Sequence, residues 1–306
     1  MSPAPTFSLI IATYGRAAVL EALVQSLVKQ SNQSFEVIVA DQNSDDDVAP
    51  LLEPLRQAGR LAAHLRLPAP NLSAARNAGI AAANGVFVAF PDDDCWYDPD
   101  TLARAEARLV ATPPLDGIAA RWAEAPAEPG DNLQGPITPA AIRKFRAGNL
   151  ASITLMVKRE AVLAIGGFDE RIGVGRWYGS GEETDLMLAL VAGGCRIAHA
   201  SDVVVHHAFD TSRRHEGRWD VVRSRARGTG ALYAKHHLPG WVIARGLLAP
   251  LLPRDGMTLK TGAALSLGRL EGLIGWSLHE RRSRSVATAV AGRTAATSET
   301  KTGGAA

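Results

Sequence analysis

Cysteine is almost absent from this 306-residue sequence, since Cys95 and Cys195 are the only two. Two thiols are too few for a disulfide framework or for a zinc site built from cysteines, and this scarcity is typical of a reducing cytosol. At the N-terminus, Phe7–Ala12 is too short for the apolar region of a signal peptide and already has the pattern of a strand. We therefore expect no signal peptide and a cytoplasmic protein.

Long apolar runs are also missing. The stretch Val242–Leu252 is interrupted by Arg245 and Gly246 and is too short to span a bilayer. The chain has 46% hydrophobic and 21% charged residues, which is the composition of a globular protein and excludes disorder of the whole chain.

The charge is unevenly divided along the chain, although the formal net charge is only +2. Residues 1–210 carry 17 Lys and Arg against 25 Asp and Glu, whereas residues 211–306 carry 16 against 6. This asymmetry predicts an acidic domain over residues 1–210 and a basic helical extension over 211–284. The remaining tail, 285–306, is rich in Ala, Thr, Ser and Gly, and we expect it to be disordered.

Strand and helix patterns alternate through the first third of the chain. Apolar runs at 7–12, 35–40, 61–67 and 86–90 predict strands, and segments with helical spacing separate them. Such alternation predicts parallel strands, whose ligands bind at their carboxyl ends. Polar turns follow the first, second and fourth runs, so one site assembled from several loops is expected there.

The fourth run ends in three consecutive carboxylates, Asp92, Asp93 and Asp94. Adjacent acids repel one another, and a hard divalent cation explains their place at the end of a buried strand, because Mg²⁺ and Mn²⁺ take oxygen ligands and bridge carboxylates to phosphates. The alternative is a solvated acidic turn that caps the following helix.

Five separated segments together resemble the family 2 inverting glycosyltransferases of GT-A fold. They are Ile10–Tyr14, Val37–Asp41, Ser73–Gly79, Phe90–Asp94 and Gly181–Leu186, within a match over residues 7–208. The resemblance implies an α/β fold of the GT-A type over residues 1–210, with a Rossmann-like, mostly parallel central sheet flanked by helices. It implies that the enzyme depends on a metal and transfers a hexosyl or related sugar from a nucleotide-diphosphate sugar with inversion. The first expected donor is a UDP-sugar. The acceptor would be the hydroxyl of a sugar or of a lipid-linked molecule in polysaccharide or glycoconjugate synthesis.

The resemblance also implies which residues bind the donor. Thr13 and Tyr14 would line the base pocket, and Asp41 would accept a hydrogen bond from the base or the ribose. The other implied donor-binding residues are Arg76, Asn77, Asp92 and Asp93. Two alternatives stay open: Asp41 as a cap of a helix or turn, and Arg76 as a structural ion pair with the Asp92–Asp94 run.

The implied cofactor is Mn²⁺ or Mg²⁺. Asp94 is the first expected ligand and Asp92 the second, with His206 as a third contact near the end of the last predicted strand. An imidazole ligand favours Mn²⁺ over Mg²⁺. His207 is the competing residue, one position further along the chain.

An inverting transfer needs a general base for the acceptor hydroxyl. The family usually has an Asp after a Glu at the start of a helix, whereas this chain has Glu183 in that place and Asp185 two residues later. We expect Glu183 to be the base and Asp185 to be the next candidate. Alternatively, these acids only complement the dipole of their helix.

Two other functions compete with sugar transfer. The departure at Glu183 leaves open a non-catalytic module that binds nucleotide sugars or serves as a membrane scaffold. A nucleotidyltransferase is also an alternative, but its expected Gly-rich phosphate loop does not fit in the short turn Thr13–Arg16.

The basic C-terminal third combines arginines with aromatic and apolar residues, including Trp219 and Trp276. Apolar helices with flanking Arg and Trp are typical of helices that lie in the plane of an anionic membrane surface. We therefore expect peripheral attachment to the inner face of the cell membrane. A helical appendage or a dimer interface is the alternative, and no nucleic-acid partner is predicted.

Overall fold

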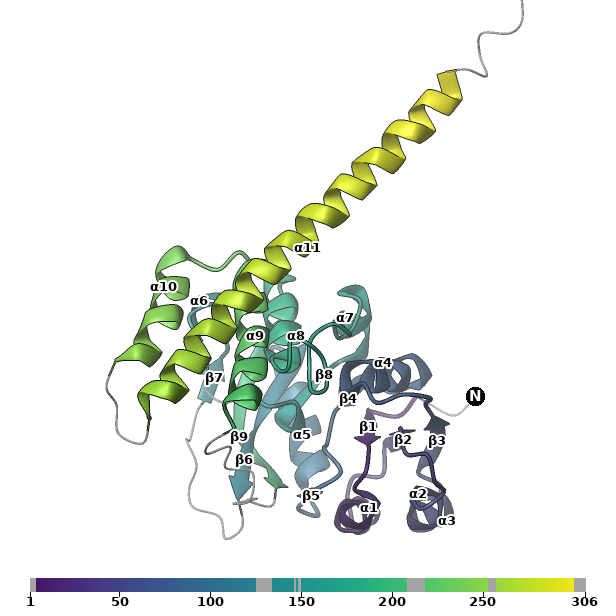
Figure 1. The fold of residues 1–306 in the computed structure, drawn as a ribbon. Helices are drawn as coiled ribbons and strands as arrows, with labels where there is room; N and C mark the ends of the chain where they lie inside the picture. The colour runs from purple at the N-terminus through teal and green to yellow at the C-terminus, as the bar shows by residue number, and fades with distance from the viewer. Residues whose placement is uncertain are drawn as a thin grey trace, which may run out of the picture. The chain divides into compact units, whose positions relative to one another are not determined.

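The computed structural model describes residues 4–124, 134–145, 147, 150–207, 218–252 and 257–299, with the backbone alone for Glu124 and for residues 283–299. The chain divides into two compact units, Met1–Glu216 and Gly217–Ala306. The first unit holds a nine-stranded sheet with helices around it, and the second is helical (Figure 1). The α/β class and the C-terminal helices predicted from the sequence are confirmed.

The first half of the sheet is parallel. Its strands lie in the order β3 (Leu61–Arg66), β2 (Phe35–Asp41), β1 (Phe7–Thr13) and β4 (Phe87–Ala89). All four were predicted, because each central strand is a run of buried apolar residues. Thr13 pairs with Asp41 in the register of β1 and β2, and an isolated bridge joins Ala12 to Asp92. The carboxyl ends of β1 and β2 and the loop after β4 therefore meet at one edge.

The second half of the sheet is mostly antiparallel, so the predicted predominance of parallel strands is wrong there. The order continues with β8 (Leu155–Lys158), β6 (Gly117–Glu124), β9 (Ile197–His207) and β5 (Cys95–Tyr97), while β7 (Gln134–Pro136) pairs with β9. Only β6 and β9 are parallel neighbours in this half. Strand β6 has few β-branched residues, and it lies in the segment Pro113–Pro139, whose Pro, Ala and Gly content predicts irregular or hairpin-like structure. Its pairing with β8 and β9 makes it a strand.

Helices flank this sheet, and the burial of one face explains each long one. Helix α1 (Leu20–Val28) buries Leu20, Leu23, Val24 and Leu27. The other helical elements of the unit are η1 (Ala17–Val19), α2 (Val48–Leu51), α3 (Glu53–Gln57), α4 (Leu72–Ala82), α5 (Thr101–Leu109), α6 (Pro139–Ile142), η2 (Ser152–Thr154), α7 (Arg159–Ala164) and α8 (Glu182–Ala192). One helix predicted over 48–58 is divided into α2 and α3, because Pro54 cannot donate a backbone hydrogen bond and starts a new helix.

The second unit contains α9 (Trp219–Lys235), α10 (Gly240–Leu248), η4 (Ala249–Leu251) and α11 (Leu259–Glu299). Helices α9 and α11 lie side by side in Figure 1. Within the part of the chain that the structure describes, no helix is long and apolar enough to cross a membrane. Helix α11 runs on to Glu299, where the composition of the tail predicts disorder, because its alanine-rich continuation extends a helix that α9 already stabilises. Residues 300–306 of that tail, and Arg213 and Arg214 of the basic segment, lie outside the described residues.

Glycine permits the close approach of α9 and α11. A Cβ atom on Gly272 would lie 1.9 Å from the carbonyl oxygen of Arg227, and one on Gly268 would lie 2.3 Å from that of Arg223. Beside this contact, Arg223 Nε and Arg227 Nε donate to Glu271 Oε2 over 3.0 and 2.9 Å. These hydrogen bonds, together with the positive charges of the two arginines, lower the pKa of Glu271 to about 2.

Gly272→Ala is expected to destabilise the second unit, because its methyl group would force the α9 backbone away. Overpacking of this kind costs about 1–3 kcal/mol, which thermal unfolding followed by circular dichroism would record as a lower Tm. Gly240→Ala is the matched control, since a Cβ there meets nothing within 4 Å. Equal Tm values for the two variants would contradict the tight packing of α9 on α11.

Candidate functional site

Side chains from the ends of β1 and β4 meet around the three carboxylates. Thr13 Oγ1 donates to Asp93 Oδ2 over 2.9 Å, and both residues are almost fully buried. Arg16, in the turn after β1, donates to Asp93 Oδ1 over 2.5 Å and to Asp94 Oδ2 over 2.6 Å. Burial and the neighbouring acids raise the pKa of Asp93 to about 6, although Arg16 and Thr13 oppose this rise. One guanidinium thus holds two of the three acids at the end of β1.

His207 is the histidine that contacts the acidic run. Its Nε2 lies 3.1 Å from Asp94 Oδ1, because β9 and β5 are antiparallel neighbours that pair His207 with Cys95. Burial alone would raise the pKa of Asp94, but the hydrogen bond with His207 and the charge of Arg16 hold it well below its usual range. Asp94 is therefore an ionised acceptor beside an imidazole.

His206, predicted as the metal contact, has Asp98 and Trp96 as neighbours in the structure. Successive side chains of a strand point to opposite faces, so a shift of one residue reverses the direction. His206 Nε2 lies 3.0 Å from Asp98 Oδ1, and its ring stacks on Trp96 at 5.4 Å between centroids. The competing residue, His207, takes the place next to Asp94.

The donor atoms near Asp94 fit a divalent cation. One atom each from Asp94, Cys95 and His207 lie within 4.8 Å of one another. Burial raises the pKa of the Cys95 thiol far above its ordinary value, so this sulfur stays protonated and is a poor ligand. A carboxylate with an imidazole remains, and this pair suits Mn²⁺ better than it suits Mg²⁺.

Asp41 ends β2 in a fully buried position with three partners. Its Oδ1 accepts from the backbone N and from Nδ2 of Asn43 over 2.9 and 2.8 Å, and its Oδ2 lies 2.9 Å from His64 Nε2. Burial alone would raise the pKa of Asp41, but these hydrogen bonds and the charge of Arg66 lower it below its ordinary value. The backbone contact has the form of the predicted turn cap. Tyr14, directly after β1, is 57% exposed.

Arg76 links the acidic run to α8. Its Nη2 donates to Asp92 Oδ1 over 3.2 Å and to Ser152 Oγ over 2.7 Å, and its Nη1 lies 4.0 Å from Glu182 Oε1. The side chain is 2% exposed. The structure therefore shows the ion-pair alternative for Arg76, in which the guanidinium holds the loop after β4 close to the start of α8.

Asn77 also serves the scaffold. Its Nδ2 donates to the carbonyl of Phe168 over 2.9 Å and to Glu170 Oε1 over 3.1 Å, and its Oδ1 accepts from the backbone N of Phe168 over 2.8 Å. The amide predicted to contact the donor thus fixes the loop between α7 and α8 to helix α4.

Acidic residues occupy the first turn of α8. Glu182 and Asp185 are both 3% exposed, whereas Glu183 is partly buried. Among the described residues, Glu182 Oε2 and Arg76 Nη1 are buried without a hydrogen-bond partner. Burial and the Glu182 carboxylate raise the pKa of Glu183 above its ordinary value, and the charge of Arg76 lowers it less. A carboxylate with a raised pKa is better matched to accepting a proton near neutral pH.

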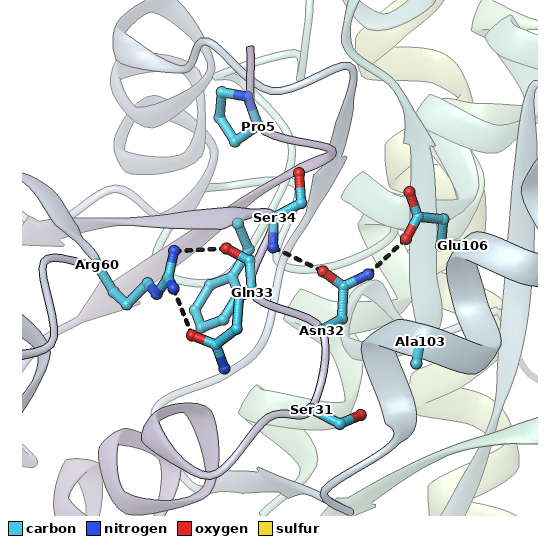
Figure 2. Close-up of a pocket in the computed structure, with 9 residues that line it drawn as sticks. Pro5, Ser31, Asn32, Gln33, Ser34, Arg60, Ala103 and Glu106 are labelled. Atoms are coloured by element: carbon cyan, nitrogen blue, oxygen red, sulfur yellow. Dashed lines mark hydrogen bonds between the residues drawn. The ribbon is translucent and has the colours of Figure 1, made fainter. Parts of the chain in front are cut away.

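Two surface hollows lie near the first unit's strands. The pocket in Figure 2, of about 730 Å³, lies at the amino ends of β1 and β2, opposite to the candidate site, and its polar side chains pair with one another, as Asn32 Nδ2 does with Glu106 Oε2 over 2.6 Å. A second pocket, of about 510 Å³, is lined by Asp94, Trp96 and the start of α1. Of these two pockets, the second adjoins the acidic run.

Reasoning from sequence missed several residues of this site. They are Arg16, His64, Ser152 and Glu182. The position of Arg16 directly after a strand that ends in the site could have pointed to it. The other three belong to β3, η2 and α8, whose packing against the site the sequence pattern does not specify.

Comparisons with known proteins agree with this fold. The model of the family described as glycosyl transferase family 2 matches residues 8–168. The putative glycosyltransferase EpsH of Bacillus subtilis is 31% identical over 96 residues, which are 31% of this chain and 28% of that protein. A PGL/p-HBAD biosynthesis glycosyltransferase of Mycobacterium bovis is 37% identical over 117 residues, which are 37% of this chain and 45% of that protein. The matches therefore span less than half the length of these relatives.

Solved structures show the same fold at low sequence identity. Staphylococcus aureus TarS 1–349 in complex with UDP-GlcNAc has a TM-score of 0.59 and 17% identity, with 90% of this chain and 92% of that chain covered. The mannosyltransferase PcManGT of Pyrobaculum calidifontis, in complex with GDP-Man and Mn²⁺, has a TM-score of 0.59 and 20% identity, with 96% and 81% covered. Because the family model matches more than half of the sequence, this chain belongs to glycosyl transferase family 2.

Proposed function

We propose that this protein transfers a sugar from a nucleotide-diphosphate sugar to the hydroxyl of an acceptor, with inversion at the anomeric carbon. The observation that carries the proposal is the meeting of an ionised Asp94, the Arg16 guanidinium and His207 at the sheet edge where β1 and β2 end. An acid, a fixed cation and an imidazole at the carboxyl ends of parallel strands suit a phosphate-bearing ligand.

The donor would lie along this edge. Asp41 and the exposed Tyr14 belong to the end proposed for the base and ribose, and Arg16 with Asp94 to the end proposed for the diphosphate. A UDP-sugar is the first candidate. TarS is seen with UDP-GlcNAc and PcManGT with GDP-Man, so related folds take either base.

Asp94 and His207 would hold the divalent cation. Their donor set fits Mn²⁺, and Asp92 remains a predicted second carboxylate ligand although its Oδ1 accepts from Arg76. A bound cation would supply charge neutralisation on the departing diphosphate. Arg16, already between Asp93 and Asp94, is placed to add positive charge at the same end.

Glu183 is the proposed base. Its carboxylate would take the proton of the acceptor hydroxyl as the oxygen bonds to the anomeric carbon, and the bond to the diphosphate breaks with its electron pair on the phosphate oxygen. The Arg76 guanidinium contacts Asp92 on one side and Glu182, the residue before Glu183, on the other. This contact would fix the distance between the base and the acidic run.

The acceptor is proposed to be a sugar or a lipid-linked molecule. Peripheral attachment to the inner face of the cell membrane, which the basic C-terminal third predicts, would bring the site to a lipid-linked acceptor.

The proposal is tested by hydrolysis of a panel of nucleotide sugars in Mn²⁺, comparing the wild type with His207→Ala. Loss of the imidazole is expected to weaken Mn²⁺-dependent nucleotide binding by roughly tenfold or more and to slow hydrolysis of the preferred donor. Calorimetric titration of UDP and GDP with and without Mn²⁺ measures the binding separately from turnover.

His206→Ala is the matched control, because it removes the neighbouring imidazole, which contacts Asp98 and Trp96 instead. It is expected to keep Mn²⁺-dependent binding. A weaker metal response in His206→Ala than in His207→Ala, or no nucleotide-sugar turnover by the wild type, would contradict the proposal.

A further inference from the structure

Large apolar side chains form an exposed stripe on α11. The outer stripe consists of Leu267, Leu270, Ile274 and Leu278, which are 45%, 41%, 50% and 50% exposed. Spacings of three and four residues place all four on one face of the helix. In a helix that packs in water, this apolar face is the one expected to be buried.

The opposite face of α11 carries small residues instead. Gly262, Gly268 and Gly272 are buried there, each with the backbone of a neighbouring segment where a Cβ would be. Among the side chains of α11 that the structure describes, Trp276 is the one large residue that is buried, and it is 2% exposed. Small residues between helices with large aliphatic residues outside are the arrangement found where helices pack in lipid.

Cationic residues lie at both ends of the outer stripe. Lys260 is seven residues before Leu267 and Arg281 is three residues after Leu278, so both share its face, and both are exposed. Two acids lie between them: Glu271 is turned to Arg223 and Arg227 of α9, and Glu280 Oε1 accepts from Trp276 Nε1 over 3.0 Å. At 1.5 Å per residue, the outer stripe is about 17 Å long and the two cations lie roughly 30 Å apart along the helix. A positive charge beyond each end of the stripe can reach lipid headgroups.

Helix α10 and the turn after it show the same composition. Trp241, Leu248 and Leu252 are 49%, 63% and 61% exposed. The Arg245 guanidinium lies 5.4 Å from the centroid of the Trp241 ring. Tryptophan beside arginine is typical of the boundary between lipid and water.

We infer that the C-terminal unit lies on an anionic lipid surface, with the outer stripe of α11 in contact with the acyl chains. This inference specifies the membrane attachment proposed above and does not depend on the transfer reaction. The charge of this part of the chain favours anionic lipid over a second copy as the partner of the stripe. Residues 211–306 carry 16 Lys and Arg against 6 Asp and Glu. A second copy would bring the same positive charge to the contact, whereas phosphatidylglycerol brings the opposite one.

The test is co-sedimentation of the full chain with vesicles of phosphatidylcholine and phosphatidylglycerol at about 7:3, a composition that carries a negative surface potential. The wild type is expected to sediment, and Leu270→Asp/Ile274→Asp to bind at least roughly tenfold more weakly, because two charges enter the apolar contact. Lys260→Glu/Arg281→Glu is expected to lose mainly the preference for anionic over neutral vesicles.

Val110→Asp/Val174→Asp is the matched control, since both valines are exposed, at 61% and 56%, in the first unit. It is expected to bind vesicles as the wild type does, and all variants are expected to keep Mn²⁺-dependent nucleotide binding. Nucleotide binding reports on the proposed site, so a wild type that does not bind nucleotide would overturn the proposed transferase function and not this inference. No vesicle binding by the wild type overturns the inference, as does equal binding by the stripe variant. A wild-type dimer in light scattering that the stripe variant converts to monomer would also overturn it.

Discussion

An Asp94→Asn variant is expected to lose sugar transfer by roughly 10²–10³-fold or more, the effect of removing a group that stabilises developing charge. The amide keeps the size of the side chain but not its charge. Arg16 and His207 would then lack the carboxylate to which they lie 2.6 and 3.1 Å away. Affinity for a divalent cation is expected to fall with the charge. Donor turnover over a Mn²⁺ titration, with nucleotide binding measured in parallel, gives both effects.

Asp98→Asn makes the same change at a second aspartate–histidine contact. Asp98 Oδ1 lies 3.0 Å from His206 Nε2, and the aspartate is 49% exposed at its side chain. Because this pair lies outside the acidic run, the variant is expected to retain most of the activity. Full activity of Asp94→Asn, or wild-type turnover in EDTA, would exclude the proposed role of Asp94.

The parallel half of the sheet could be predicted because the residue pattern within each strand is enough to identify it. Strands β1 and β2 are apolar up to their last residue except at Ser8 and Glu36, they end in polar turns, and buried parallel strands have this pattern. Strands β5 and β6 gave no such signal. Cys95–Tyr97 looks like the end of a turn, and Gly117–Glu124 becomes a strand through its neighbours β8 and β9.

The candidate site shows the same division. Asp94 could be predicted, because an acid at the end of a buried strand is visible in the sequence. The choice between His206 and His207 could not, since it depends on which face of β9 meets Asp94, and that follows from the pairing of β9 with β5. Arg76 and Asn77 have the side chains of a ligand-binding helix, but the structure uses both within the protein, with Asp92 and with the Phe168 loop.

A Glu183→Gln variant is expected to lower kcat by roughly 10²–10⁴-fold, the usual contribution of a general base, while donor binding changes little. The amide keeps the size and hydrogen-bonding capacity of Glu183 but cannot accept the proton. The wild-type pH profile provides a second readout. A base acts in its ionised form, so kcat/KM is expected to fall as the pH decreases through the pKa of Glu183. Because burial and Glu182 raise that pKa, the fall should begin at a higher pH than the ordinary value of 4.5 would give.

Asp185→Asn is the comparison that decides between the two acids of α8. Asp185 is 3% exposed, so it is less accessible to an acceptor than the partly buried Glu183, and its loss is expected to affect stability more than the pH profile. If Glu183 is the base, the residual kcat/KM of Glu183→Gln no longer falls as the pH decreases, whereas that of Asp185→Asn still does. The reverse result would place the base two residues further along the helix. Retention of both this pH dependence and the rate in each variant would show that these acids only stabilise the start of α8, where their charge complements the helix dipole.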